Sequence, residues 1–187
     1  MTHKETNLYS SRGVTLIELL VAMSVLAILL GIGVPSFSQF STNNRLSNAS
    51  NALFSSFSLA RSEAIKRSSR VVVCKSADGL VCTGAGDWSQ GWIVFSDLDN
   101  NGTKDGGEII IQKNAAMPTG YSFTGNANVS NYVSYDTQGM TKLIGGGFQS
   151  GTFRLCPPDP AVVAGSGREI ILSASGRART VKVTDCV

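Results

Sequence analysis

The sequence predicts an α+β protein in which a long amino-terminal α-helix packs on an antiparallel β-sheet domain. Two patterns support this fold: residues 14–67 carry an apolar run followed by apolar residues at helical spacing, and the remainder alternates short β-rich runs with Gly, Asn and Asp. The chain has 187 residues, of which 42% are hydrophobic and 16% charged, and a net charge of +3. This size and composition fit one globular domain with a short appendage.

Residues 14–34 form the first half of the expected helix and are apolar over a length that can span a bilayer. Lys4 and Arg12 precede this segment, and basic residues there favour an amino terminus that stays in the cytoplasm. Glu18 is the single charged residue within the segment. A charge inside a span costs roughly 2.5 to 3.5 kcal/mol on insertion scales, so we expect Glu18 either to meet a cation or to reach back to the membrane interface.

The string SRGVTLIELL at residues 11–20 resembles the processing site of type IV pilins and pseudopilins. In that family a prepilin peptidase cuts after the glycine and methylates the new amino terminus. The resemblance implies a type IV pilin-like fold, a leader of residues 1–13, a cut between Gly13 and Val14, and N-methylation of Val14. It also implies that residues 14–34 lie in the inner membrane, that the following domain is periplasmic, and that Glu18 pairs with a neighbouring subunit's α-amino group during assembly.

Residues 35–67 are predicted to continue as an amphipathic helix. Pro35 is expected to kink or interrupt the helix at the start of this segment. Lys66 and Arg67 suit the last turn, where the helix dipole favours positive charge. Apolar residues recur at spacings of three and four and define one face that we expect to be buried: Leu46, Ala49, Leu53, Phe57, Ala60 and Ala64.

Residues 68–187 are predicted to form the β-rich periplasmic domain. Near its end, residues 168–186 form a hairpin pattern that turns at Ser175 and Gly176. The predicted strands before that turn are Arg70–Lys75, Gly91–Ser96, Glu108–Gln112, Ser130–Tyr135, Thr152–Cys156 and Glu169–Ser173.

The four cysteines all follow the apolar segment, in a compartment where disulfides persist, and their even number favours two bridges. Three pairings are possible. We prefer Cys74 with Cys82, which closes a short hairpin, and Cys156 with Cys186, which ties the carboxy terminus to a strand.

The loop Asp97–Glu108 matches the calcium-loop pattern of EF-hands position for position. The segments on either side have the pattern of strands, however, whereas helices brace an EF-hand. A plain polar turn is therefore the favoured interpretation, and calcium binding is the alternative. No metal and no cofactor is expected.

The only histidine, His3, lies in the predicted leader. A processed chain without histidine cannot use a Ser-His-Asp or Cys-His mechanism, and it cannot bind a metal through histidine. We therefore expect no enzymatic activity.

A second distinctive string, Gly176-Arg177-Ala178-Arg179, precedes Cys186. It resembles the Gly-Arg-x-Arg motif of FimT members of the FimT/GspH family, minor pilins associated with natural transformation in which this motif contacts DNA. The resemblance implies that Gly176, Arg177 and Arg179 contact DNA.

The two arginines, two residues apart in an extended chain, share one face and suit successive phosphates. Lys182 is expected to extend this basic patch, although a regular strand turns it to the other face. Arg168 is a candidate for a further contact. About three phosphate contacts predict a log–log salt slope near −2.7 and binding without sequence preference.

The expected function is therefore that of a minor type IV pilin that binds DNA non-specifically and supports DNA uptake in natural transformation. Its expected partners are DNA, other major and minor pilins, the prepilin peptidase and the inner membrane. One alternative is a GspH-like minor pseudopilin of a type II secretion system, and another is a pilus-assembly initiator without DNA binding. In the first alternative the arginines are ordinary charges that protect an edge strand from aggregation, and in the second the basic tail contacts another pilin.

Overall fold

The computed structural model describes residues 13–159, 166–183 and 186. The chain divides into two compact units, an amino-terminal unit (Met1–Phe40) and a globular unit (Ser41–Val187). One helix, α1 (Leu16–Arg67), runs through both units, and all strands belong to the globular unit.

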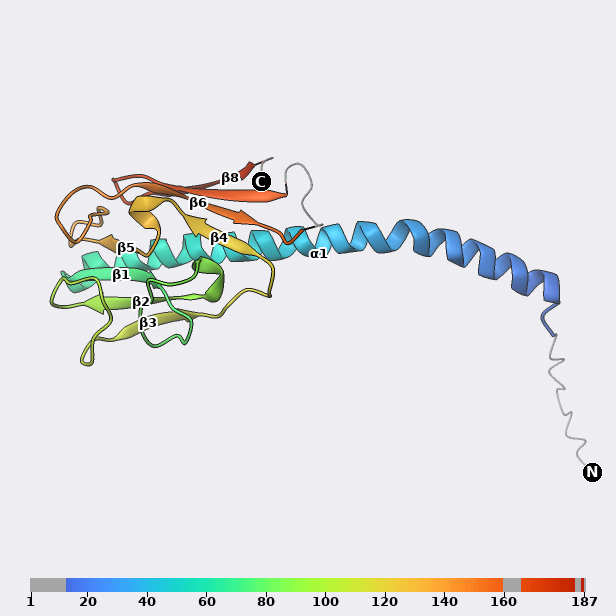
Figure 1. The fold of residues 1–187 in the computed structure, drawn as a ribbon, viewed down its shortest axis with the longest axis horizontal. Coiled ribbons are helices and arrows are strands. Elements are labelled where there is room, and N and C mark those ends of the chain that lie inside the picture. Colours follow the sequence, from blue (N-terminus) through green and yellow to red (C-terminus); the bar gives the residue numbers. More distant parts are fainter. Residues whose placement is uncertain (1–12, 160–165, 184–185, 187) are drawn as a thin grey trace, which may run out of the picture. The chain divides into compact units, whose positions relative to one another are not determined.

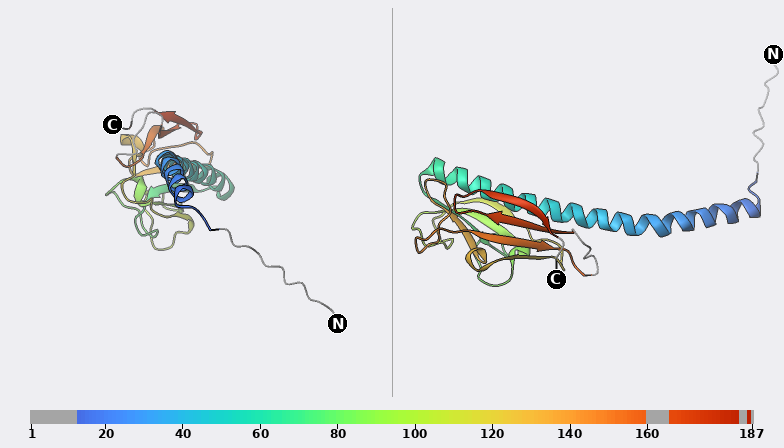
Figure 2. Two further views of the ribbon diagram at one scale, coloured as in Figure 1. Left: turned by 90° about the vertical axis from the view of Figure 1, so that its right-hand side faces the viewer. Right: turned by 90° about the horizontal axis from the view of Figure 1, so that it is seen from above.

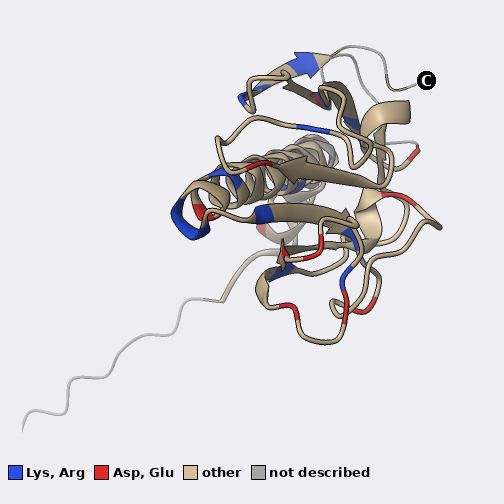
Figure 3. Cartoon of the chain, turned by 90° about the vertical axis from the view of Figure 1, so that its left-hand side faces the viewer, with Lys and Arg blue, Asp and Glu red and all other residues tan. Residues whose placement is uncertain are grey.

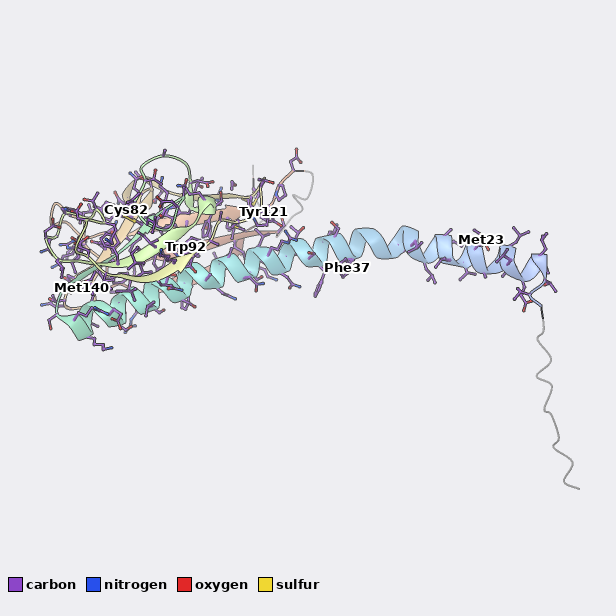
Figure 4. The ribbon with its side chains drawn as sticks, turned by 90° about the horizontal axis from the view of Figure 1, so that it is seen from below. Met23, Phe37, Cys82, Trp92, Tyr121 and Met140 are labelled. Atoms are coloured by element: carbon purple, nitrogen blue, oxygen red, sulfur yellow. A yellow bond between two sulfur atoms is a disulfide. The ribbon has the colours of Figure 1, made fainter. Side chains whose placement is uncertain are left out.

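The part of α1 in the amino-terminal unit exposes its apolar side chains. Met23 is 61% exposed and Phe37 is 72% exposed, and both project outward from the helix (Figure 4). Within the described residues, α1 is the one helix long and apolar enough to cross a membrane. The predicted interruption at Pro35 is wrong, because the helix continues through this position. A proline removes only one helical N–H donor, and the turns on either side keep their own hydrogen bonds.

The globular unit contains two four-stranded antiparallel sheets (Figure 1). The first has the order β3-β2-β1-β5 and the second the order β4-β6-β7-β8, so β8 lies at an edge. Two short 3-10 helices, η1 (Trp88–Gln90) and η2 (Ala127–Val129), lie between strands. The strands are β1 (Arg70–Lys75), β2 (Trp92–Asp97), β3 (Ile110–Asn114), β4 (Ser122–Gly125), β5 (Tyr132–Tyr135), β6 (Gly151–Cys156), β7 (Gly167–Leu172) and β8 (Ala178–Val183).

The α+β fold with a long helix packed on antiparallel sheets is confirmed, with three differences of detail. The strands form two sheets, and β4 was missing from the predicted strands because Phe123 is its only buried residue. The strand predicted to begin at Glu108 begins instead at Ile110. The Glu108 carboxylate accepts hydrogen bonds from Leu98 N at 2.7 Å and Asp105 N at 2.9 Å, which keeps this residue in the loop.

The second half of α1 lies along one side of the strands (Figure 2, right panel) and contributes to a core shared with both sheets. The Phe153 ring lies 5.2 Å from the ring of Phe57 on α1 and 5.2 Å from that of Trp88. Trp92 of β2 is buried, and its indole N–H donates to Ser56 Oγ of α1 at 2.9 Å. The predicted apolar face is confirmed, since five of its residues are buried: Leu46, Leu53, Phe57, Ala60 and Ala64.

Two disulfides close the globular unit, Cys74 with Cys82 and Cys156 with Cys186. They join the pairs that the sequence analysis prefers. The buried core residues of the described chain begin at Leu46, so the globular unit holds the whole core and both disulfides. We therefore expect this unit to fold when it is expressed alone.

Phe153→Ala is expected to lower the free energy of unfolding of the globular unit by about 3–5 kcal/mol, because it removes the ring that Phe57, Trp88 and Phe123 contact. Urea denaturation followed by tryptophan fluorescence measures the change. The matched control is Phe148→Ala, whose side chain is 66% exposed and should cost less than about 0.5 kcal/mol. Equal losses in the two variants would contradict this description of the core.

Candidate nucleic-acid interface at the β7–β8 turn

A tight turn, Ser173–Arg177, joins β7 to the edge strand β8 and is named the β7–β8 turn below. The two strands pair from Gly167 opposite Val183 to Leu172 opposite Ala178. Gly176 N donates to Ser173 O at 2.9 Å, and Ser173 N donates to Arg177 O at 2.9 Å. The hairpin therefore turns where the sequence analysis expects, at Ser175 and Gly176.

Gly176 is required at this position for two reasons. Its φ of 76° lies in the left-handed region, which residues with a side chain adopt reluctantly. A Cβ atom there would also lie 2.2 Å from Gly139 O and 3.1 Å from Tyr135 Cε1. The Tyr135 hydroxyl donates to Gly176 O at 3.5 Å. The turn thus packs closely against the residues that follow β5.

The loop after β5 is held by Asp136. Its carboxylate accepts hydrogen bonds from Gln138 N and Met140 N, both at 2.9 Å, and lies 2.9 Å from Lys142 Nζ. Burial by itself would raise the pKa of Asp136, but the Lys142 ammonium and the two N–H groups lower this pKa below its ordinary value. Asp136 is therefore ionised and already neutralised by Lys142, so it offers little repulsion to an anion at the neighbouring β7–β8 turn.

Arg177 and Arg179 are both exposed, and neither side chain has an ion pair or hydrogen bond within the described part of the chain. Arg177 lies just before β8, and Arg179 lies opposite Ile171 of β7. Glu169 of β7 is engaged elsewhere, since its carboxylate lies 2.7 Å from Arg154 Nη2. Two guanidinium groups are thus left uncompensated at the surface.

Lys182 does not extend this pair. β8 pairs with β7 without a bulge, and Lys182 lies three residues beyond Arg179, so the two side chains lie on opposite faces of the strand. Lys182 is exposed. The register shows that it does not lie in the same row as Arg177 and Arg179, as the sequence analysis expected it to.

Arg168, the candidate for a further contact, does not join the arginine pair. Its side chain is only 7% exposed and donates to Gly167 O at 2.9 Å and to Ser47 Oγ of α1 at 3.3 Å. Arg168 shares the inner face of β7 with Ile170 and Leu172, so alternation along the strand explains its burial. It ties β7 to α1 and is not available to a phosphate.

A cation that the sequence analysis missed, Arg61 of α1, lies near the β7–β8 turn. Arg61 and Arg177 line the same groove, which is named the helix–turn groove below. A Cβ atom on Gly139 would lie 3.0 Å from Arg61 Nε, so the loop after β5 also packs on this side chain. Figure 3 shows Lys and Arg positions at the end of α1 and on the strand that leads to the carboxy terminus, and several Asp and Glu positions on the lower loops.

The acidic loop after β2 gathers Asp97, Asp99 and Glu108, whose carboxylate oxygens lie within 4.8 Å of one another. Asp97 accepts hydrogen bonds from Asn101 N at 3.1 Å and Gly102 N at 3.0 Å. Burial raises the pKa of Asp97, although these N–H groups oppose the rise. The bonds within the loop are those of the favoured polar turn, and calcium binding stays the untested alternative.

At the amino-terminal end of α1, Glu18 has a local partner. Its carboxylate accepts hydrogen bonds from Thr15 N and Thr15 Oγ1, both at 3.3 Å, and Glu18 N donates to Thr15 Oγ1 at 3.3 Å. This reciprocal pattern is a capping box, which the Thr-x-x-Glu spacing could have predicted. Gly13 and Val14, the predicted processing residues, lie just before it and are exposed.

Gly176→Ala is expected to lower the free energy of unfolding of the globular unit by about 1–3 kcal/mol, because alanine is strained at positive φ and its Cβ would collide with Gly139 O. Thermal or urea denaturation measures the loss. Gly145→Ala is the matched control: a Cβ there meets no atom within 4 Å, and we expect a change of less than about 0.5 kcal/mol. A stable Gly176→Ala variant would show that the turn is not held as described.

Comparison with known proteins identifies two family models in the chain. The model described as type II transport protein GspH matches residues 49–176, and the prokaryotic N-terminal methylation motif matches residues 8–34. Comparison with curated proteins yields no significant match.

Among solved structures, the fold is similar to the type IV minor pilin FimU of Pseudomonas aeruginosa in two crystal forms. One match has a TM-score of 0.58 at 18% identity and covers 79% of this chain and 99% of that chain. The other has a TM-score of 0.55 at 18% identity and covers 76% and 100%. The minor pseudopilin EpsH of the Vibrio cholerae type 2 secretion system also matches, with a TM-score of 0.48 at 10% identity, over 74% of this chain and 97% of that chain.

The chain combines a helix long and apolar enough to cross a membrane with the methylation motif and a two-sheet globular unit. These are the features of a subunit that is anchored in the inner membrane and incorporated into a pilus or pseudopilus. Such subunits are structural proteins and assemble with other pilins after processing by the prepilin peptidase. Because the GspH model covers more than half of its residues, the chain belongs to the GspH family of type IV minor pilins and pseudopilins.

Proposed function

We propose that this protein is a minor type IV pilin that binds DNA non-specifically through Gly176, Arg177 and Arg179 and supports DNA uptake in natural transformation. The observation that carries the proposal is the pair of exposed arginines at the β7–β8 turn, which have no ion pair within the described residues. The resemblance of this string to the DNA-contacting motif of FimT members supports the same function.

The chemistry of the pair suits a phosphate backbone. Each guanidinium presents a planar set of N–H donors that matches two phosphate oxygens. Gly176 is buried against Gly139 and Tyr135, and its left-handed conformation fixes the turn beside which the two arginines lie. Arg177 and Arg179 together neutralise two phosphates, which corresponds to a log–log salt slope of about −1.8. Contacts of this kind carry no base information, so the binding is independent of sequence.

The same proposal includes processing and assembly. The prepilin peptidase cuts between Gly13 and Val14 and methylates Val14, residues 14–34 anchor the subunit in the inner membrane, and the globular unit faces the periplasm. In the filament the Glu18 carboxylate leaves Thr15 and pairs with the α-amino group at Val14 of a neighbouring subunit. A carboxylate within a lipid environment gains most from such a cation, because water does not compete there.

A second candidate function is that of a GspH-like minor pseudopilin of a type II secretion system, with no role for DNA. The match of the GspH model to residues 49–176 favours it as much as it favours a pilus subunit. The two functions differ in what they require of Arg177 and Arg179, so DNA binding distinguishes them.

Arg177→Ala/Arg179→Ala is expected to weaken binding of duplex DNA to the globular unit at low salt and to make the log–log salt slope shallower by about 1.8, because two phosphate contacts are lost. Fluorescence anisotropy with labelled duplex across a salt series measures both quantities. Thermal denaturation should show no change in stability, since both side chains are exposed.

The charge-matched control is Arg45→Ala/Lys113→Ala, which removes two exposed cations from α1 and β3. It should retain most of the binding. An equal loss in the control would mean that net charge attracts the DNA without a defined site. Absence of binding by the wild-type unit at low salt would favour the pseudopilin.

Glu18→Gln is expected to prevent incorporation of the full-length protein into filaments while leaving membrane insertion and processing intact. Glutamine retains the capping-box geometry with Thr15 but removes the charge that pairs with an α-amino group. Immunoblotting of sheared filaments and of membrane fractions checks the two outcomes. Normal incorporation of Glu18→Gln, together with loss in Glu18→Ala, would show that Glu18 acts by capping alone.

A further inference from the structure

The helix–turn groove is a concave surface of about 430 Å³ between α1 and the β7–β8 turn. Its volume lies within the range of small-molecule sites. Both of its walls belong to the globular unit, so its shape is set by the packing of α1 on the two sheets. The residues that define its character are Phe54, Phe57, Arg61, Ile65, Arg177 and Ala178.

The floor and one wall of the groove are apolar, and the wall is accessible. Phe57 is buried beneath it, whereas Phe54 is 39% exposed and Ile65 is 49% exposed on the helix surface. Ser58 and Ser62, which also line the groove, donate their hydroxyl hydrogens to carbonyl groups of their own helix. The helix thus presents an aromatic ring and an aliphatic side chain, and the hydroxyl groups near them already have hydrogen-bond partners.

The rim of the groove carries positive charge from two separate elements. Arg61 comes from α1 and Arg177 from the β7–β8 turn, and neither forms an ion pair in the portion of the chain that the structure describes. The acidic residue nearest to Arg61 in sequence, Glu63, is engaged by Arg67 at 2.5 Å and Lys66 at 3.6 Å. An apolar recess with two uncompensated guanidinium groups suits a flat apolar ring that is attached to an anion.

We propose that the helix–turn groove binds one nucleotide of single-stranded DNA, with the base against Phe54 and Ile65 and the adjoining phosphates on Arg61 and Arg177. The inference rests on the proposed DNA binding at Arg177 and Arg179 and extends it from the backbone to a base. In a duplex the bases are stacked inside the helix and cannot enter a groove. A base on an aromatic side chain binds without sequence preference, because every base has a flat face.

The groove therefore predicts a preference for single strands over duplex at equal salt. It also separates two contributions: Phe54 acts on the base, and Arg177 acts on the phosphate of either form of DNA. A variant of Phe54 should weaken only ligands that carry accessible bases.

The test measures the affinity of the globular unit for three labelled probes by fluorescence anisotropy: a short oligothymidylate, an abasic strand of equal length, and a duplex. Phe54→Ala should weaken binding of the oligothymidylate about tenfold and leave the other two probes unchanged. Phe148→Ala, which removes an exposed ring that does not line the groove, is the matched control and should leave all three unchanged. Thermal denaturation confirms that both variants are folded.

Three results would overturn the inference. If wild type binds the oligothymidylate and the abasic strand with equal affinity, no base is bound and the inference is wrong. In that case the proposed function still holds if duplex binding depends on Arg177. If Phe54→Ala binds the oligothymidylate as wild type does, and the full-length variant is no longer incorporated into filaments, the groove is a contact surface for another pilin. Absence of binding to all three probes would remove the proposed function together with this inference.

Discussion

The contact between the apolar face of α1 and the inner faces of both sheets determines the rest of the globular unit. Phe57 meets Phe153 of the second sheet at 5.2 Å, and Ser56, the residue before it, accepts a hydrogen bond from Trp92 of the first sheet. The helix thus holds two sheets that share no strand. Because burial of this face removes large apolar side chains from water, separation of either sheet from α1 would expose a substantial part of the core.

This packing also places the cations. β8 is the edge strand of the second sheet, and the β7–β8 turn lies beside the carboxy-terminal half of α1, where Arg61 and Arg177 line one groove. The acidic residues along these elements have their own partners, as the pairs of Asp136 with Lys142 and Glu169 with Arg154 illustrate. The surface around the turn therefore keeps an uncompensated positive charge without a large net charge on the whole chain.

Much of the fold could be predicted because it depends on local periodicity. Spacings of three and four identified the buried face from Leu46 to Ala64, and the Ser175–Gly176 turn marked the final hairpin. The division into two sheets could not be predicted, because pairing between distant strands leaves no local pattern. β4 was missed for a related reason: its single buried residue, Phe123, does not make an alternating run.

The candidate site was predicted in part. Arg177 and Arg179 are exposed as expected, whereas Arg168 is buried, and its alternation with Ile170 and Leu172 could have indicated this. Arg61 was missed because it is brought to the β7–β8 turn only by the packing of α1 on the second sheet. Arg61 and Arg177 are more than a hundred residues apart in sequence, so no local pattern around either of them indicates that they lie together.

The central claim is that DNA contacts the β7–β8 turn and the neighbouring surface of α1. The most direct measurement is an NMR titration of the isotope-labelled globular unit with DNA, in which amide shift changes are followed residue by residue. The account predicts changes at residues 173–179 and around Arg61, and none in the acidic loop Asp97–Glu108. Changes confined to other surfaces, or none at low salt, would contradict it.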